Sequence, residues 1–287
     1  MHNCLLILAG GDSSRMKKSI SVDELSSEEI KQANTQSKAL ISHGSNNRPI
    51  LDFLLLNAEK AGYKNIILIV GEQHDAFKMY YGKETANNTF NGLKISYAIQ
   101  HIPEERKKPF GTADAVTQAL EQYPHLQKES FTVCNCDNLY SVKALQEMAT
   151  TIAQNAFISY DRDDLEFSMQ RISRFALVLL DSENHVIDII EKPSEENLES
   201  YRDALGKFRV SMNIFKLDGA QLFPYLKYCP PHPVRNEKEL PTAILNFCKE
   251  HPSNFKGIPF YEHVPDLTSK EDIRIFKNFL HTHFKEN

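Results

Sequence analysis

The chain has 287 residues, of which 41% are hydrophobic and 25% are charged, and its formal net charge is -5 at pH 7. This composition is typical of a globular protein with a sizeable core, and it disfavours proteins that grip a nucleic-acid backbone, which usually carry a basic excess. No run approaches the roughly 20 apolar residues of a membrane helix, so neither nucleic acid nor a membrane is an expected partner.

The first half of the chain alternates strand and helix signals. Short apolar runs predict buried strands, and apolar residues at helical spacing with proline or glycine at the ends predict helices. In chain order the predicted elements are a strand at 4–9, a helix at 49–61, strands at 65–70 and 93–99, a helix at 111–123, a strand at 131–136, a helix at 142–154 and a strand at 156–160. This alternation predicts an α/β fold with a Rossmann-like, mostly parallel sheet and helices on both faces.

The second half has strand signals without long helices between them, which predicts antiparallel additions and a mixed sheet. The predicted elements are strands at 175–180, 186–190 and 209–215, helices at 219–228 and 237–249, a strand at 255–261 and a helix at 269–283. The polar stretch at 17–36 lacks apolar periodicity, but Ser26 and Glu29 form a capping-box pattern that predicts a short surface helix. With no repeat and no clear linker, one domain over 1–287 is expected.

The cysteines are odd in number and scattered along the chain (Cys4, Cys134, Cys136, Cys229 and Cys248). This pattern favours reduced thiols, and hence a cytoplasmic location, over a disulfide framework. Cys134 and Cys136 are interpreted as small buried strand residues rather than metal ligands, because no second pair lies near them in sequence.

The first predicted strand runs into a glycine-containing loop, Leu8-Ala9-Gly10-Gly11-Asp12-Ser13-Ser14-Arg15-Met16. In an open α/β sheet, ligands bind at the carboxyl ends of the strands. Glycines let the backbone approach a nucleotide closely and point N–H groups at phosphate oxygens. Arg15 can add a planar guanidinium to the same oxygens. On these residues alone, a structural turn and a phosphate-binding loop both remain open.

The loop resembles the signature of the sugar-phosphate nucleotidyltransferases, in which a glycine-rich loop is followed by arginine and lysine. Two departures stand out: Ser13 occupies the position of the last family glycine, and the matching lysine, Lys38, comes 23 residues after Arg15. An insertion at about 19–36 would explain the spacing. Serine tolerates positive φ poorly, so Ser13 raises the question of how the loop is shaped.

Further matches follow in the family's order. The resemblance implies that Gln100 reads the base, and that Gly111-Thr112-Ala113-Asp114-Ala115-Val116 packs against the nucleotide at a helix start. A helix N-terminus with a close-approach glycine suits an anion or a polar ring edge. The same segment is similar to the form in glucose 1-phosphate enzymes, which favours glucose.

Two carboxylates and a sugar-binding set complete the resemblance. Asp137 follows a predicted strand, where a carboxylate can hold Mg²⁺ against phosphate oxygens. By resemblance, Asp266 in the closing segment is the second metal ligand. Glu191 and Lys192 bind the sugar and its phosphate, and Asn213 lies at a sugar-binding turn.

The resemblance implies a nucleotidyltransferase that condenses a nucleoside triphosphate (NTP) with a sugar 1-phosphate, with Mg²⁺ as cofactor. The attacking phosphate is already anionic, so catalysis needs positioning and charge neutralisation rather than a general base. Arg15, Lys38 and Asp137 are the expected catalytic residues, and the nucleotide-binding set adds Leu8, Ala9, Gly10, Gly11, Gln100, Gly111 and Thr112. The halves at about 1–140 and 141–287 would bind nucleotide and sugar. Homo-oligomers are common in the family, although nothing in the sequence identifies an interface.

Three other functions stay open from the sequence. A nucleotide-sugar glycosyltransferase would also place an Asp and a metal after a strand, but would not need Arg15 and Lys38 on a leaving pyrophosphate. A cytidylyltransferase could act on a non-sugar phosphate such as phosphocholine. An inactive nucleotide-sensing module is favoured by Ser13 and by Cys136, which replaces a family glycine.

Overall fold

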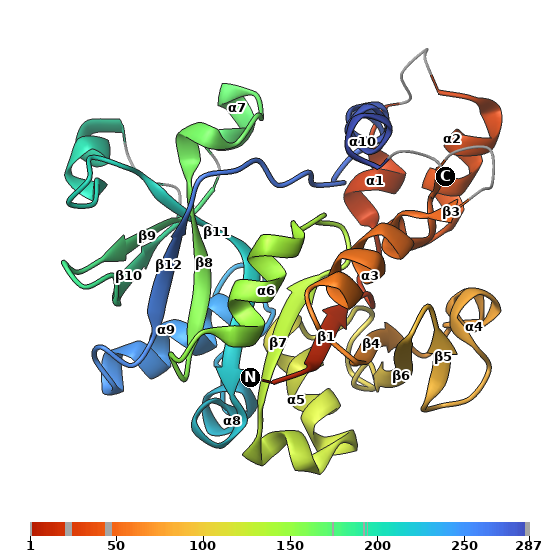
Figure 1. Ribbon diagram of the computed structural model, residues 1–287, viewed down its shortest axis with the longest axis horizontal. Helices are drawn as coiled ribbons and strands as arrows, with labels where there is room; N and C mark the ends of the chain where they lie inside the picture. The colour runs from red at the N-terminus through yellow and green to blue at the C-terminus, as the bar shows by residue number, and fades with distance from the viewer. Residues whose placement is uncertain are drawn as a thin grey trace.

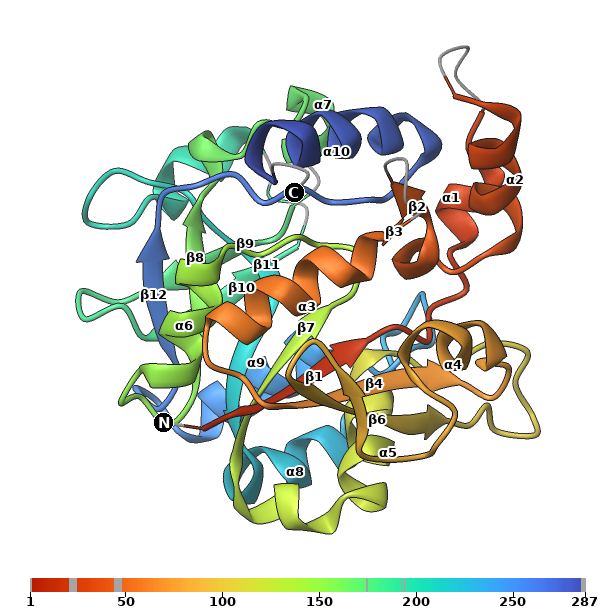
Figure 2. The same ribbon diagram turned by 45° about the vertical axis from the view of Figure 1, so that its right-hand side comes forward.

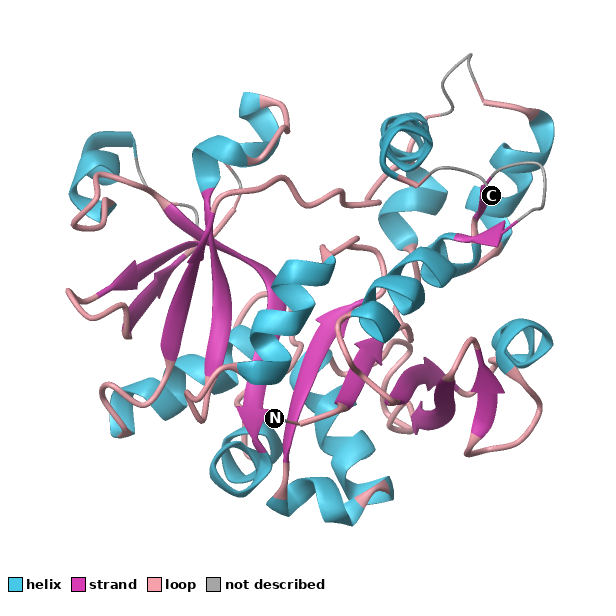
Figure 3. Ribbon diagram, in the orientation of Figure 1, coloured by secondary structure: helices cyan, strands magenta, loops and turns pink. Residues whose placement is uncertain are grey.

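A computed structural model describes residues 2–20, 25–43, 48–173, 175–191, 193 and 195–284. Its centre is a 10-stranded mixed sheet with helices on both faces (Figures 1 and 3). The predicted fold class is therefore confirmed. Among the described residues, no helix is long and apolar enough to cross a membrane.

The first half supplies the parallel part of the sheet. Its strands are β1 (Cys4–Leu8), β4 (Asn65–Gly71), β6 (Leu93–Gln100) and β7 (Ser130–Asn135). β1 pairs in parallel with β4 on one side and with β7 on the other, and β4 pairs in parallel with β6. Because parallel strands end at the same edge, the loops after β1, β6 and β7 meet there.

The second half adds the antiparallel strands that its sequence predicted. They are centred on β11 (Arg209–Asp218), which pairs antiparallel with β7, β8 and β9. The neighbouring strands are β8 (Ala156–Asp161), β9 (Leu177–Leu180), β10 (Val186–Ile190) and β12 (Lys256–Phe260). β12 pairs in parallel with β8, and β10 pairs antiparallel with β9.

Alternate residues of β1 face two separate cores. Leu5 and Ile7 belong to the cluster covered by α3 (Ile50–Lys60), α6 (Val142–Thr150) and α10 (Lys270–His283). Cys4 and Leu6 belong to the opposite cluster, covered by α5 (Thr112–Gln122), α8 (Gly219–Lys227) and α9 (Leu240–Glu250). Figure 2 shows α3 above β1 and α8 below it, on opposite sides of the sheet. The apolar run of β1 is thus buried on both faces, as a central parallel strand requires.

The insertion contains the predicted surface helix, α2 (Ser27–Thr35), and the capping box of Ser26 and Glu29 is confirmed. α2 lies beside α1 (Ser14–Lys18) and beside α10, which is far away in the sequence (Figure 1). An ion pair between Lys277 and Glu29 joins α10 to α2.

Several short elements were not predicted from the sequence, because two or three strand residues or one or two helical turns show little periodicity. They include β2 (Ser42–His43), β3 (Arg48–Pro49), α4 (Asp75–Tyr81), β5 (Asn88–Phe90), α7 (Met169–Ile172) and the 3-10 helices η1 (Lys38–Leu40), η2 (Pro124–Lys128), η3 (Arg162–Asp164) and η4 (Glu195–Tyr201). Two predicted helices were too long: α6 ends at Thr150, because Thr151 is extended, and α9 begins at Leu240.

Candidate functional site

A cleft of about 390 Å³ opens at the carboxyl ends of the parallel strands. Ten of the predicted residues line it: Leu8, Ala9, Gly10, Gly11, Arg15, Lys38, Gln100, Gly111, Thr112 and Asp137. They come from the loop after β1, from η1, from the end of β6, from the start of α5 and from the loop after β7. The structure therefore gathers the predicted nucleotide-binding and catalytic residues in one place.

Ser13 takes the left-handed conformation that the glycine of the family signature would favour, with φ at 53°. Its hydroxyl accepts a hydrogen bond of 3.3 Å from the backbone N–H of Lys38. The side chain thus bridges the glycine loop to the residue that follows the insertion, a contact that glycine could not make. Gly10 sits tightly behind this turn, since an added Cβ would lie 3.3 Å from Gly71 N.

Arg15 stands on α1, is exposed, and has no ion-pair partner among the described residues. The C-terminal end of α1 is held by the buried Lys270, whose Nζ donates to the backbone oxygens of Met16, Lys17 and Ser19 at 3.0, 3.2 and 2.6 Å. A cation at the carbonyl end of a helix is favourable. Lys270 therefore fixes the short helix that presents Arg15 to the cleft.

The buried Gln100 is oriented by α5. Its Nε2 donates to Gly111 O at 3.0 Å and to Asp114 Oδ2 at 2.9 Å. Gly111 has φ at +110°, and an added Cβ would lie 2.3 Å from Lys238 O, so only glycine fits there. Thr112 lines the cleft, and its hydroxyl also accepts from the backbone N–H of Leu240 at 2.9 Å, which fastens α9 to α5.

Lys38 and Asp137 form an ion pair with 3.0 Å between Nζ and Oδ2, although they lie 99 positions apart. The Lys38 side chain is only 9% exposed and the Asp137 side chain 19%. Low exposure strengthens the interaction, because solvent screens it less.

Asp266 does not line the cleft, but its backbone segment pairs with the segment that carries Asp137. The N–H of Leu267 donates to Asp137 O at 2.9 Å, and Asn138 and Asp266 form an antiparallel bridge. Burial and the Asp137 carboxylate raise the pKa of Asp266. Its Oδ2 accepts from the Arg171 guanidinium and from the Thr268 hydroxyl.

The residues predicted for the sugar lie apart from this cleft. Glu191 and Asn213 line a smaller cavity of about 80 Å³, with mostly apolar neighbours. Asn213 has φ at 58° and lies where the β11–β8 register shifts, so the predicted backbone turn is present. Glu191 is paired instead with Arg235, at 3.0 Å. Lys192 lies outside the described residues.

Glu191 also belongs to a potential metal-ligand cluster with His232 and Glu239, whose ligand atoms lie within 4.8 Å of one another. Arg235 pairs with both carboxylates of this cluster, at 3.0 Å to Glu191 and 2.6 Å to Glu239. The guanidinium offsets one of the two acidic charges and contacts both carboxylates, so the cluster is held as an ion-pair network.

Several site neighbours were missed from the sequence. Lys108 lines the cleft, and the basic run at 106–108 just before Gly111 was a readable signal for it. Arg171 and Lys270 reach the site from 95 and 254 positions away from their partners, Asp266 and Met16. No local pattern marks contacts of that kind.

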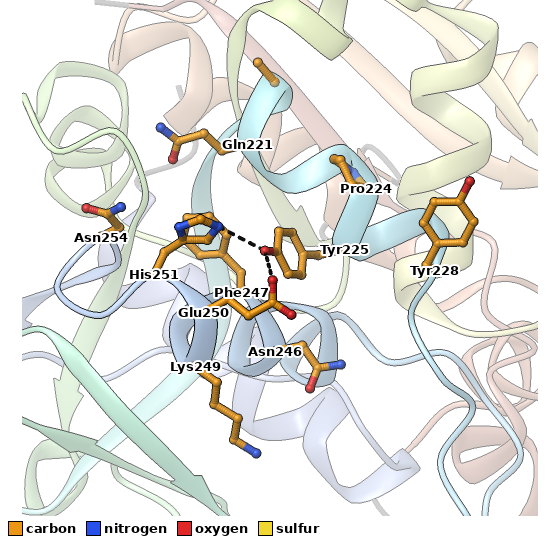
Figure 4. A pocket seen from close by; sticks show the side chains of 11 residues that line it. Gln221, Pro224, Tyr225, Tyr228, Asn246, Phe247, Lys249, Glu250, His251 and Asn254 are labelled. Atoms are coloured by element: carbon orange, nitrogen blue, oxygen red, sulfur yellow. Dashed lines mark hydrogen bonds between the residues drawn. The ribbon is translucent and has the colours of Figure 1, made fainter.

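A second groove, of about 750 Å³, lies between α8 and α9 (Figure 4). Tyr225 donates from its hydroxyl to Glu250 Oε2 at 2.6 Å, and the same hydroxyl lies 3.0 Å from His251 Nε2. None of the predicted nucleotide-binding or catalytic residues lines this groove.

Known proteins resemble the chain in both sequence and fold. Two D-glycero-alpha-D-manno-heptose 1-phosphate guanylyltransferases align with it: one from Campylobacter jejuni at 28% identity over 41% of this chain and 48% of that enzyme, and one from Aneurinibacillus thermoaerophilus at 27% over 33% and 36%. The chain thus matches half or less of the length of these relatives.

Two solved structures share the fold over nearly their whole length. A UDP-glucose pyrophosphorylase complexed with UDP-glucose has a TM-score of 0.70 at 16% identity, covering 98% of this chain and 99% of that one. A Bacillus anthracis protein assigned as a glucose-1-phosphate thymidylyltransferase, in complex with sucrose, has a TM-score of 0.68 at 17% identity, covering 99% and 97%. The sequence profile of the nucleotidyl transferase family matches residues 5–225. The chain therefore belongs to the nucleotidyl transferase family, the family that its loop and its later motifs resemble.

Proposed function

We propose that the chain transfers a nucleotidyl group from an NTP to a sugar 1-phosphate, giving a nucleotide sugar and pyrophosphate. The observation that carries the proposal is the Lys38–Asp137 pair, which lies 3.0 Å apart in the same cleft as the glycine loop and Arg15. A cation and a carboxylate beside bare backbone N–H groups suit a triphosphate and its counter-ion. The names of the aligned and superposed proteins support the sugar-phosphate class.

In this reaction an acceptor phosphate oxygen attacks the α-phosphorus in line, a P–O bond forms, and the bond to the leaving pyrophosphate breaks. Arg15 and Lys38, which both line the cleft, would neutralise charge on the triphosphate and on the pyrophosphate as it leaves. Positioning and preorganised charge supply the catalysis, because the nucleophile is already anionic.

The donor set fits Mg²⁺. Asp137 and Asp266 are hard oxygen ligands on adjacent backbone segments, and Mg²⁺ in such enzymes is commonly bound by one or two carboxylates plus substrate phosphates. These two carboxylates would hold the ion, which when bound neutralises phosphate charge. Gln100 and the start of α5 would face the base, and the half with Glu191 and Asn213 would face the acceptor.

The identity of the sugar is a separate part of the proposal. The Gly111–Val116 segment favours glucose 1-phosphate, whereas the aligned relatives are named for a heptose 1-phosphate. The test is a pyrophosphate-release screen that crosses four NTPs with glucose 1-phosphate, other hexose 1-phosphates, the heptose 1-phosphate and phosphocholine, with Mg²⁺ present. Release with one sugar 1-phosphate supports the proposal. Release with phosphocholine alone, or no release despite NTP binding, contradicts it.

A further inference from the structure

Two cationic side chains already neutralise the two carboxylates of the candidate metal site. Lys38 Nζ pairs with Asp137 Oδ2 at 3.0 Å, and Arg171 Nη2 pairs with Asp266 Oδ2. These four groups carry no net formal charge, and with Asp272, which also pairs with Arg171, the cluster carries −1 instead of the −3 of the three carboxylates alone. A divalent cation is attracted by the net charge of its site. This cluster therefore attracts such a cation less strongly than its carboxylates would without Lys38 and Arg171.

Arg171 is fastened in this place by several contacts. Its Nη1 donates to Asp272 Oδ1 at 2.5 Å, and its Nη2 also lies 3.3 Å from the backbone oxygen of Asp266. Its guanidinium stacks over Phe167, 4.3 Å from the ring centroid. The contacts explain why the guanidinium stays on Asp266 rather than in solvent.

The element that carries Arg171 is nevertheless short and partly exposed. Arg171 is 22% exposed and stands on α7, a helix of four residues in the connection between β8 and β9. A single helical turn has few internal hydrogen bonds to hold it. Phosphate oxygens are strong partners for a guanidinium, so a bound triphosphate or acceptor phosphate can compete with Asp266 for Arg171.

We propose that Arg171 is a resident counter-ion of Asp266 that keeps the nucleotide-free protein from capturing a divalent cation. Asp266 becomes available when substrate phosphates draw Arg171 and Lys38 away from the carboxylates, so metal binding follows nucleotide binding. The inference rests on the proposed function for the use of the site, but it predicts a property of the free protein. In the opposite role, Arg171 would orient Asp266 for the metal. Removing Arg171 would then weaken metal binding instead of tightening it.

The test is Mn²⁺ binding to the full chain without nucleotide, measured from the loss of the free-ion EPR signal. Arg171→Gln removes the charge and is expected to tighten Mn²⁺ binding by about tenfold or more. Arg171→Lys retains the charge and should bind Mn²⁺ much as the unmodified chain does. Arg202→Gln is the matched control, because Arg202 pairs with Glu199 and not with either metal carboxylate; it should not change the affinity.

Phe167→Leu supplies a second variant if Arg171→Gln does not fold. It removes the stacking partner, leaves every charge, and should tighten Mn²⁺ binding by a smaller factor. Unchanged or weaker binding in a folded Arg171→Gln protein, or in Phe167→Leu where only that variant folds, overturns the inference. Pyrophosphate release by the unmodified chain is read separately: turnover without tighter binding in Arg171→Gln rejects only the counter-ion role, and tighter binding without turnover on any sugar 1-phosphate rejects only the proposed function.

Discussion

The Ser13 hydroxyl accepts a hydrogen bond from the backbone N–H of Lys38, at 3.3 Å and across 25 positions of sequence. This contact connects the glycine loop to the ion-paired lysine on the far side of the insertion. Ser13 also bears a left-handed backbone, which costs a non-glycine residue energy. The side-chain bond offsets that cost, so the departure from the family pattern has a structural purpose.

Replacing Ser13 by alanine should therefore weaken the cleft. Ser13→Ala keeps the backbone strain and loses the hydrogen bond, which is worth about 0.5–1.5 kcal/mol. We expect kcat/KM for the NTP to fall by roughly threefold to tenfold. Ser13→Gly relieves the strain and should lose less. Ser200→Ala, which removes an exposed hydroxyl bonded only to Asn197 O, is the control; equal kinetics in all three variants would deny Ser13 this role.

Asp137→Asn should abolish pyrophosphate release while the protein stays folded. The substitution keeps the shape of the side chain but removes the charge that pairs with Lys38 and that would hold Mg²⁺. Loss of one preorganised electrostatic group typically costs about a hundredfold to a thousandfold in kcat. Steady-state kinetics and circular dichroism check both parts, with the exposed Asp75→Asn as control. Near-normal turnover would remove Asp137 from the metal site.

Lys270→Met should disturb both stability and the presentation of Arg15. The buried ammonium donates to three carbonyl oxygens at the end of α1, and methionine leaves all three without that donor. We expect the free energy of unfolding to fall by about 2–4 kcal/mol. Urea unfolding measures this loss, and the exposed Lys249→Met should not show it.

If Lys270 positions Arg15, the KM for the NTP should rise more than kcat falls. Lys270→Arg keeps a cationic donor at the end of α1 and should restore part of the affinity. A stable Lys270→Met protein with unchanged KM would show that α1 holds its place without this residue.

Acid should destabilise the protein partly through His2. Burial lowers the pKa of His2 to about 4, with the nearby Lys216 acting in the same direction. Because the folded-state pKa lies below the ordinary histidine value of 6.5, the folded protein binds this proton less readily than the unfolded chain. The contribution is present above pH 6.5 and is lost as pH falls towards 4.

The size of this effect should be on the order of 2 kcal/mol. The measurement is the free energy of unfolding as a function of pH. His2→Gln should flatten the profile in that window, and the exposed His281→Gln should leave it as it is. A profile that His2→Gln does not change would assign the acid sensitivity to other groups.

The sequence was sufficient for the main strands and for most of the helices. β1, β4 and β7 are mostly apolar runs because they are buried on both faces, and a run of that kind is visible in any local window. β6 has one face that is partly exposed, and its sequence is accordingly mixed. The parallel pairing in the first half was also predicted, since parallel strands need crossovers and the helical signals supplied them. The α4 and α7 helices were missed, because they are too short to show a period.

Local motifs likewise located the cleft. The Gly10–Gly11 loop, the Gly111 helix start and Asp137 each follow a strand or precede a helix, so one rule about the carboxyl ends of parallel strands placed them together. Glu191 shows the limit of the same reasoning. Glu191 was assigned to the sugar by resemblance, and in the folded chain it pairs with Arg235 on a different loop.

The sequence by itself determined the family, the α/β alternation and most of the predicted residues that line the cleft, because those properties follow from short periodic or contiguous patterns. Only the tertiary structure decided which distant side chains and backbone groups contact one another. Arg171 on Asp266, Lys270 at the end of α1 and Thr112 on the start of α9 join residues separated by 95, 254 and 128 positions. Such contacts depend on how the whole sheet closes, and a cation near a carboxylate leaves no mark on the spacing of either one. The glycine loop was readable, but the hydrogen bond from Lys38 that explains Ser13 appears only in the folded chain.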